Sequence, residues 1–187
     1  MIVELGCVMD LREETIESVE AFTGSLVKLR VDRVRLPNGK ETIREIVVHR
    51  GAVALVPMID GEKIIMIRQF RQAAGEVLFE IPAGTLEPNE DPLVCAQREL
   101  CEETGYLPGK LTLMFKSYLA PGYSSEMLYT YLAENIAIAE VDPEEDEFIE
   151  IIELSLSDAV DMISKGEIKD AKTICGLLMA QKILASR

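Results

Sequence analysis

Three glutamates are crowded onto one turn of a predicted helix. Glu99, Glu102 and Glu103 stand at positions i, i+3 and i+4, so on a helix their carboxylates project from the same face. Like charges at this spacing repel one another, and bound divalent cations would neutralise them. Carboxylate oxygens suit hard ions such as Mg²⁺ or Mn²⁺, and a protein-bound Mg²⁺ usually also binds phosphate oxygens of a substrate. The spacing therefore predicts metal-assisted chemistry on a phosphate-bearing molecule.

The residues around this triplet follow a longer pattern. It reads Gly84, five residues, Glu90, seven residues, Arg98-Glu99-apolar-any-Glu102-Glu103-any-Gly105-Tyr106. This stretch resembles the signature of the Nudix hydrolases, and it meets every fixed position. The resemblance implies a loop, helix and loop whose three helix glutamates bind the ions, together with the backbone carbonyl of Ala83. Glu90 and Arg98 are expected to brace the motif by charge pairing.

A catalytic base is expected elsewhere, because the helix glutamates are occupied by metal. The acidic loop from Asp142 to Glu150 resembles the loop before the last strand in ADP-ribose pyrophosphatases, where a Glu-x-Glu pair supplies the catalytic carboxylate. Aligning the following strand puts this pair at Glu145 and Glu147, and Glu145 is the favoured base. The alternative is that the loop is only a solvated run of negative charge.

Three stretches outside the signature resemble the ADP-ribose branch of the family. They are Arg68-Gln-Phe-Arg71 before Phe79-Glu-Ile-Pro-Ala-Gly84, the segment Arg44-Glu45 to Val53, and Pro121-Gly122-Tyr-Ser-Ser-Glu126. The resemblance implies that Arg71 reaches the diphosphate and that Arg44 and Glu45 contact the adenine. Gly122 and Glu126 complete the expected substrate set, with Glu126 near the terminal ribose or a metal-bound water.

The chain departs from some relatives in one respect, because it contains no tryptophan to clamp an adenine. Arg44 or a tyrosine would have to replace that clamp. Diphosphate hydrolysis is therefore better supported by the sequence than the choice of adenine.

The resemblance leads to one main hypothesis, a Mg²⁺-dependent enzyme that splits ADP-ribose into AMP and ribose 5-phosphate. A second hypothesis is a hydrolase of another nucleoside diphosphate sugar, such as GDP-mannose. A third is a non-catalytic sensor of nucleotide sugars. The intact signature and the lack of room for a DNA-binding domain argue against this third hypothesis.

Composition limits the partners and the compartment. Nineteen basic and 33 acidic residues give a formal net charge of −14, which would repel a nucleic acid. No apolar run reaches membrane-spanning length, and the first residues lack the basic start of a secretory signal. The four cysteines have no paired spacing, so we expect reduced thiols in a cytoplasmic protein.

The pattern of apolar residues predicts an α+β chain with mixed sheets and helices. The resemblance implies the Nudix fold, in which helices flank these sheets. We expect an N-terminal antiparallel β unit over residues 1–50 and a Nudix hydrolase domain over 51–187. The expected strands cover 27–31, 42–48, 52–59, 64–70, 78–81, 111–119, 127–132 and 148–154. The expected helices cover 13–22, the acidic stretch from Asp91 to Gly105, 157–165 and 171–186.

The N-terminal strands have an apolar face but are too few to close a core. In the resembling branch this unit packs on a second subunit and contributes to its substrate pocket. We therefore expect a homodimer with shared active sites, in which Arg44 and Glu45 face the metal site of the partner.

Overall fold

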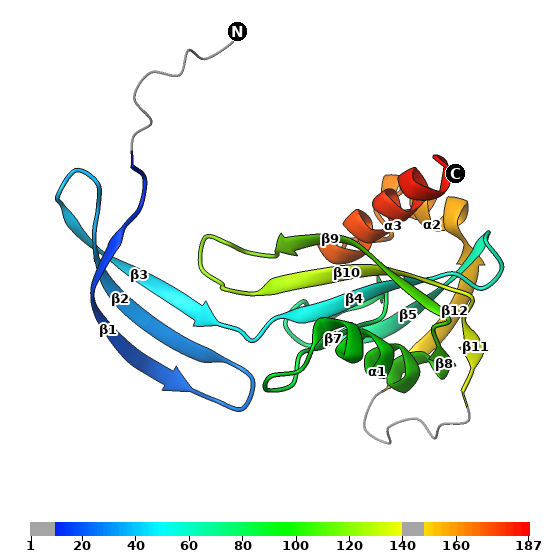
Figure 1. The fold of residues 1–187 in the computed structure, drawn as a ribbon, viewed down its shortest axis with the longest axis horizontal. Coiled ribbons are helices and arrows are strands. Elements are labelled where there is room, and N and C mark those ends of the chain that lie inside the picture. Colours follow the sequence, from blue (N-terminus) through cyan, green and yellow to red (C-terminus); the bar gives the residue numbers. More distant parts are fainter. Residues whose placement is uncertain (1–9, 140–147) are drawn as a thin grey trace, which may run out of the picture. The chain divides into compact units, whose positions relative to one another are not determined.

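A computed structural model describes residues 10–139 and 148–187 of the 187-residue chain. The chain forms two compact units (Figure 1). The first comprises Met1–His49 and Ala120–Glu126, and the second comprises Arg50–Leu119 and Met127–Arg187. None of the helices in the described part of the chain is both long and apolar enough to cross a membrane.

The first unit is an antiparallel sheet in the order β1-β2-β3. Its strands are β1 Glu14–Thr23, β2 Lys28–Arg35 and β3 Glu41–Val48. The turn between β2 and β3 lies at Pro37-Asn38-Gly39, a sequence typical of turns, where Gly39 adopts a φ of 82°. Glycine takes this left-handed conformation without steric cost.

The helix expected over residues 13–22 was wrong, because this segment is strand β1. Thr15, Ile16 and Val19 are β-branched and favour an extended backbone. The acidic residues of the segment pair across the sheet rather than along a helix: Glu14 binds Arg35 at 2.8 Å and Glu17 binds Arg33 at 3.1 Å. Cross-strand partners from β2 therefore decide the conformation of a segment that local periodicity left ambiguous.

The loop 120–126 extends this sheet beyond β3. The Val47 amide donates to the Tyr123 carbonyl at 2.7 Å, and the Ser125 amide donates to the Val47 carbonyl at 3.0 Å. The His49 amide also donates to the Ser125 hydroxyl at 2.9 Å. A segment far along the sequence thus satisfies backbone groups at the outer edge of β3.

The second unit contains mixed sheets and three helices, which confirms the predicted α+β class. The helices are α1 Pro92–Thr104, α2 Leu156–Ser164 and α3 Ala171–Leu184. A four-stranded sheet has the order β7-β4-β10-β9, with β7 Ala83–Thr85, β4 Ala52–Pro57, β10 Met127–Glu134 and β9 Lys110–Tyr118. A three-stranded sheet has the order β12-β5-β6, with β12 Glu150–Ser155, β5 Lys63–Arg71 and β6 Glu76–Glu80. The small pair β8 Tyr106–Leu107 and β11 Ala137–Ile138 follows α1 and β10.

Strand β4 lies at the centre of the second unit and is buried on both faces. Ala54 and Val56 face a cluster that includes residues of α2 and α3. Val53 and Leu55 face a second cluster built with α1. Figure 1 shows the same layering, with α1 on one side of the sheet and α2 and α3 on the other. The parallel pairing of β4 with β10 fits this doubly covered position.

Helix α1 begins and ends where the sequence predicts. The Asp91 carboxylate accepts a hydrogen bond from the Leu93 amide at 2.8 Å, Pro92 occupies the first turn, and Gly105 ends the helix with a φ of 72°. The spacing of Leu93, Ala96 and Leu100 predicts that these three residues form the buried stripe of the helix, but this was wrong for Leu93, which is 43% exposed. Cys95 is fully buried with Leu100, so the buried face is rotated toward the cysteine.

Gly176 marks the closest approach of α3 to the sheet. A Cβ added there would lie 2.8 Å from Ile81 Cδ1 and 3.3 Å from a methyl carbon of Val56. Both neighbours are fully buried, so neither can move without disturbing the core.

We therefore predict that Gly176→Val lowers the free energy of unfolding by about 1–3 kcal/mol, because the added methyl groups overpack this contact. Urea unfolding followed by circular dichroism measures the change. Cys175→Ala, at the exposed neighbouring position, is the matched control and should stay within about 0.5 kcal/mol of the unsubstituted protein. Equal stabilities for Gly176→Val and the control would contradict this account of the packing.

Candidate metal and diphosphate site

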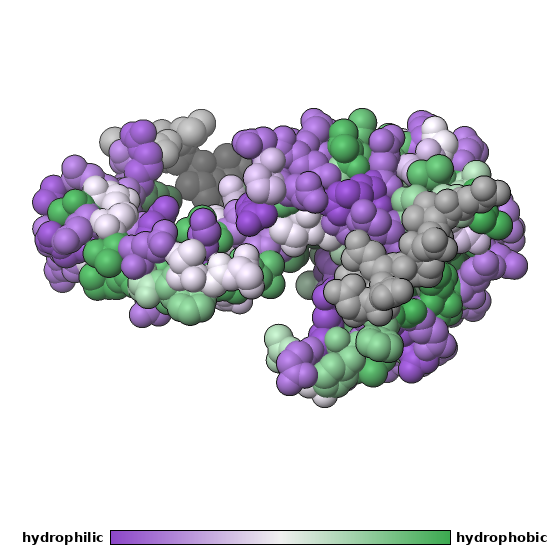
Figure 2. Space-filling view, turned by 90° about the horizontal axis from the view of Figure 1, so that it is seen from below, coloured by the Kyte–Doolittle hydropathy of each residue, from purple (hydrophilic) through white to green (hydrophobic). Residues whose placement is uncertain are grey.

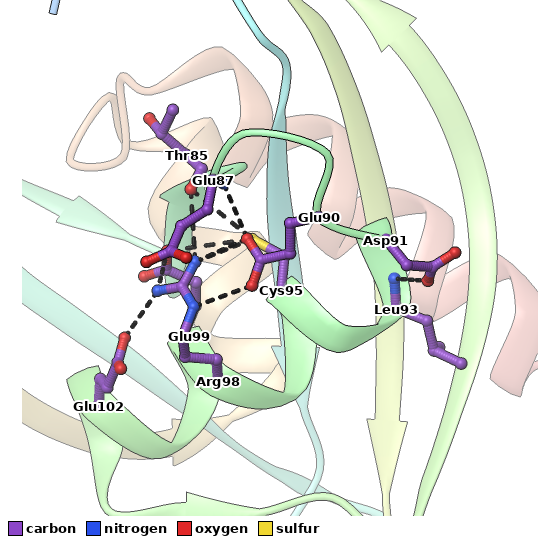
Figure 3. Close-up of polar contacts among 9 residues, drawn as sticks. All are labelled: Thr85, Glu87, Glu90, Asp91, Leu93, Cys95, Arg98, Glu99 and Glu102. Carbon is purple, nitrogen blue, oxygen red and sulfur yellow. Dashed lines mark hydrogen bonds and ion pairs between the residues drawn. The ribbon is translucent and has the colours of Figure 1, made fainter.

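Arg98 is the central cation of the α1 signature (Figure 3). Its Nε and Nη2 atoms each donate to the Glu90 carboxylate at 3.0 Å. Its Nη1 atom lies 2.8 Å from a carboxylate oxygen of Glu99 and 2.8 Å from one of Glu102. The predicted pairing of Glu90 with Arg98 is therefore present, and the same guanidinium also neutralises two of the helix glutamates.

These contacts shift the ionisation of the pair. The hydrogen bond from Arg98, followed by one from the Glu87 amide, lowers the pKa of Glu90 to about 2. The hydrogen bond to Glu90 likewise raises the pKa of Arg98 above its usual range. Both groups are charged at neutral pH, so this bidentate ion pair links the loop before α1 to the helix.

Gly84 makes room for the carboxylate of Glu99. A Cβ added to Gly84 would lie only 2.0 Å from each carboxylate oxygen of Glu99, which is far inside van der Waals contact. Any side chain at position 84 would displace Glu99. The first glycine of the signature is thus explained by close approach rather than by an unusual backbone angle.

Glu103 is fixed from the other side of the motif. Its carboxylate accepts a hydrogen bond from the Ala83 amide at 2.8 Å. Ala83 begins β7, which pairs with the buried strand β4, so the donor belongs to a rigid element. The structure thus places Ala83 next to Glu103, two of the residues that the sequence suggested for one site.

The donors on α1 suit a hard divalent cation, because all of them are carboxylate oxygens. In the described residues no three acidic, cysteine or histidine side chains are grouped closely enough to hold an ion together. Arg98 supplies the counter-charge at Glu99 and Glu102, and a backbone amide binds Glu103. The close fit of Glu99 over Gly84 shows that the fold reserves space for these oxygens.

Cys95 lies beneath the carboxylates and is completely buried. Its sulfur is 3.8 Å from the Thr85 carbonyl oxygen and 4.0 Å from Glu99 Oε1. Burial, together with the hydrogen bond to Glu90, raises the pKa of this thiol to about 12. It is therefore a protonated packing residue and not a nucleophile.

Arg71, the predicted diphosphate ligand, lies at the end of β5. Its Nε and Nη2 atoms donate to the two oxygens of Glu80 at 2.8 and 2.7 Å. Glu80 also accepts from Lys172 on α3. The sequence analysis did not single out Glu80, although one charged residue inside the apolar run Val77 to Ile81 is a signal for a buried ion pair.

The other expected substrate residues lie in the first unit. Arg44 donates to Glu13 through Nε at 3.0 Å and Nη2 at 2.6 Å, while Glu45 on the same strand is exposed. Gly122 is exposed, and no atom lies within 4 Å of a Cβ added to it. Glu126 Oε1 lies 3.9 Å from Nδ1 of His49. Glu145 and Glu147, the expected bases, lie outside the described residues.

Two family models match the chain and together cover most of it. The NUDIX domain model matches residues 48–177, and the model of the nucleoside diphosphate sugar hydrolase N-terminal domain matches residues 13–47. The second match covers strands β1 to β3 of the first unit.

Three named relatives are similar to this chain over most of their length. An ADP-ribose pyrophosphatase of Bacillus subtilis is 46% identical over 87% of this chain and 89% of its own. A methanol dehydrogenase activator of Bacillus methanolicus is 41% identical over 90% of this chain and 92% of its own. A GDP-mannose pyrophosphatase of Yersinia pestis is 38% identical over 75% of this chain and 76% of its own.

The fold is also that of a solved structure, an ADP compounds hydrolase. It superimposes with a TM-score of 0.83 over 94% of this chain and 95% of its own, at 21% sequence identity. The signature geometry on α1, both family models and the identity to whole-length relatives agree. The chain belongs to the Nudix hydrolase family, in the group that carries the nucleoside diphosphate sugar hydrolase N-terminal domain.

Proposed function

We propose that this Nudix hydrolase splits the diphosphate bond of ADP-ribose, giving AMP and ribose 5-phosphate, with Mg²⁺ as the preferred ion. The observation that carries the proposal is the arrangement of the α1 carboxylates beside the guanidinium of Arg98, which Glu90 holds in place. Glu103 accepts a hydrogen bond from the Ala83 amide. The hydrogen bond to Glu80 raises the pKa of Arg71, and the charge of Glu103 adds to this rise. The whole-length similarity to an ADP-ribose pyrophosphatase supports this choice of substrate.

The residues divide the work by charge. Glu99, Glu102 and Glu103 would hold the divalent ions, which neutralise phosphate charge and lower the pKa of the attacking water. Arg71 would bind a diphosphate oxygen and stabilise the negative charge that grows there during attack. Glu90 and Arg98 would keep α1 in register with the loop from Gly84, so that the carboxylates stay in place.

The alternative substrate is another nucleoside diphosphate sugar, because a GDP-mannose pyrophosphatase is also a relative. Both substrates present the same diphosphate to the α1 site, and they differ in base and sugar. Arg44, Glu45, Gly122 and Glu126 are proposed to make that choice.

A substrate panel tests the function directly. The purified protein, supplied with Mg²⁺ and either ADP-ribose or GDP-mannose, should turn over ADP-ribose with the larger kcat/KM. Mass spectrometry should identify AMP and ribose 5-phosphate, and EDTA should abolish the reaction until Mg²⁺ or Mn²⁺ is restored. A larger kcat/KM for GDP-mannose would establish the alternative, and no turnover of any nucleotide sugar would refute the proposal.

Glu103→Gln should lower kcat by about 10²-fold or more, because a neutral amide is a poor ligand for a divalent cation. The substitution keeps the size of the side chain, so the thermal unfolding midpoint should change little. Glu167→Gln, an exposed carboxylate distant in sequence from the motif, is the control and should be as active as the unsubstituted protein. Near-normal turnover of Glu103→Gln at saturating Mg²⁺ would remove Glu103 from the metal site.

Glu145 is proposed as the catalytic base, with Glu147 as its rival. Glu145→Gln should lower kcat with little change in KM, because a base acts only as the transition state forms. Steady-state kinetics of the two glutamine variants decides between them. A larger loss for Glu147→Gln would move the base by two residues, and normal kcat for both would exclude this loop from catalysis.

A homodimer is proposed from the exposed apolar face of the first unit. Val19, Phe22 and Ile43 are 54%, 57% and 51% exposed, and their cross-strand partners place them on one face of the sheet. Figure 2 shows hydrophobic residues on the surface of this unit among hydrophilic ones. A second copy of the same sheet would cover that face and satisfy two-fold symmetry.

In such a dimer Arg44 and Glu45 would complete the site of the partner. Sedimentation should give the mass of two chains. Mixed dimers of inactive Glu45→Ala and inactive Glu103→Gln subunits should regain one working site. A monomer, or no rescue from two inactive parents, would refute shared sites.

We also propose a cytoplasmic location, since the three described cysteines are free thiols and so suit a reducing compartment. Cell fractionation that found the protein outside the cytoplasm would overturn this assignment.

A further inference from the structure

Glu80 is a carboxylate in the protein interior, where burying a negative charge is energetically unfavourable. Its side chain is 1% exposed, and it stands between Phe79 and Ile81 at the end of β6. Removing an ionised carboxylate from water is strongly unfavourable unless opposite charges and hydrogen bonds replace the lost solvation. Burial works to raise the pKa of Glu80, but the hydrogen bond from Arg71 and the charge of Lys172 lower it below its usual range. The group is therefore an anion held by two cations.

Arg71 forms a bidentate ion pair with Glu80. Its Nε and Nη2 atoms meet the two oxygens of Glu80, so one whole edge of the guanidinium is engaged. The opposite edge, at Nη1, points away from Glu80 because the guanidinium is planar. The side chain of Arg71 remains 43% exposed, whereas Glu80 is enclosed. A buried anchor thus holds a cation that solvent or a ligand can reach.

The ion pair of Arg71 with Glu80 lies close to the α1 signature. Glu80 is three residues before Ala83, so their Cα atoms are at most about 10 Å apart even in a fully extended chain. Ala83 donates to Glu103, so the loop after Glu80 is bonded to a motif glutamate. The hydrogen bond to Glu80 is the main cause of the raised pKa of Arg71, and the negative charge of Glu103 adds to it. Arg71 therefore lies near the motif.

Helix α3 holds the other side of Glu80. Lys172 donates both to Glu80 and to Asp170, the N-cap of α3, and is 11% exposed. The Thr173 hydroxyl donates to Asp170 at 2.6 Å and accepts from the Ile81 amide at 2.9 Å. The start of α3 is thus bonded to the backbone residue that follows Glu80, which leaves the carboxylate little freedom to move.

We propose that Glu80 is a positioning residue for the diphosphate: it locks Arg71 through Nε and Nη2, so that Nη1 is presented to the substrate without rearrangement. This inference rests on the proposed function, in which Arg71 binds the diphosphate. Glu80 itself touches no substrate. Its contribution is preorganisation, since a guanidinium already held in place loses less conformational entropy when the substrate binds.

A double-mutant cycle tests the proposal. Kinetics are measured with Mg²⁺ for the unsubstituted enzyme, Glu80→Gln, Arg71→Ala and the double variant, on whichever substrate of the panel is turned over best. We expect Glu80→Gln to raise KM about tenfold and to change kcat less, and Arg71→Ala to raise KM at least as much. In the double variant KM should equal that of Arg71→Ala, because Glu80 acts only through Arg71.

Glu76→Gln is the matched control for removing an ion-paired carboxylate from β6. Glu76 binds Lys169 at 2.6 Å but is 44% exposed, so its loss should leave KM unchanged. A second readout is the ¹⁵N signal of the Arg71 Nε–H group, identified by its absence in Arg71→Lys. Slow solvent exchange of this hydrogen should be lost in Glu80→Gln.

Glu80→Gln leaves Lys172 buried without its full counter-charge and so risks unfolding. The combination Glu80→Gln with Lys172→Met removes that unpaired cation and still frees Arg71, so it should show the same rise in KM. A folded variant of either kind with normal KM, or KM effects that multiply in the cycle, would overturn the role of Glu80. Failure of ADP-ribose turnover by the unsubstituted enzyme would instead overturn the proposed substrate, and normal KM for Arg71→Ala would overturn the role of Arg71.

Discussion

Repulsion among carboxylates on a single helical turn is the constraint that organises this protein. Each of the three α1 glutamates has a neutralising or hydrogen-bonding group close by. Glu99 and Glu102 share the Nη1 atom of Arg98, and Glu103 takes the Ala83 amide. Much of the surrounding structure serves these contacts: Glu90 holds Arg98, β4 holds β7, and the missing side chain at position 84 leaves space for Glu99. The acidic site needs no bound ion to be stable, because Arg98 supplies a positive charge and the Ala83 amide supplies a hydrogen bond.

A second charged cluster stabilises the chain just before the loop that contains Gly84. Around Glu80, two cations and an N-cap aspartate gather where β5, β6 and α3 meet. Such buried networks add little net stability compared with apolar packing, and they specify one arrangement of their members. Here that arrangement includes the end of β6, four residues before Gly84. The loop at the start of the signature is therefore held by ion pairs at both ends.

The sequence predicted the parts of the fold that local patterns control. Apolar runs and alternating apolar residues located β4, β5, β9 and β10, and the capping residues Asp91 and Gly105 located α1. The pattern failed for 13–22, where the partner strand rather than the segment itself decides the conformation. It also failed at Leu93, since the exact rotation of α1 depends on how Cys95 packs against β4.

The candidate site divides along the same line. The signature glutamates and the Glu90–Arg98 pair follow from fixed spacing along the chain, so a sequence motif can find them. Glu80 and Lys172 are 92 residues apart and meet only after α3 has packed on β6. No periodicity encodes such a contact, and the only trace in the sequence is one acidic residue in an apolar run.

The loop 120–126 has a consequence for how this architecture can change during evolution. It is covalently part of the connection between β9 and β10, yet its backbone completes the edge of β3. The N-terminal sheet is consequently not a detachable module bounded by a single junction near residue 50. Gene fusion or recombination at that junction would combine the β3 strand of one protein with the 120–126 loop of another. The strand and the loop would then have to match in length and hydrogen-bond register. Inheritance of the two units as one piece is the simpler route.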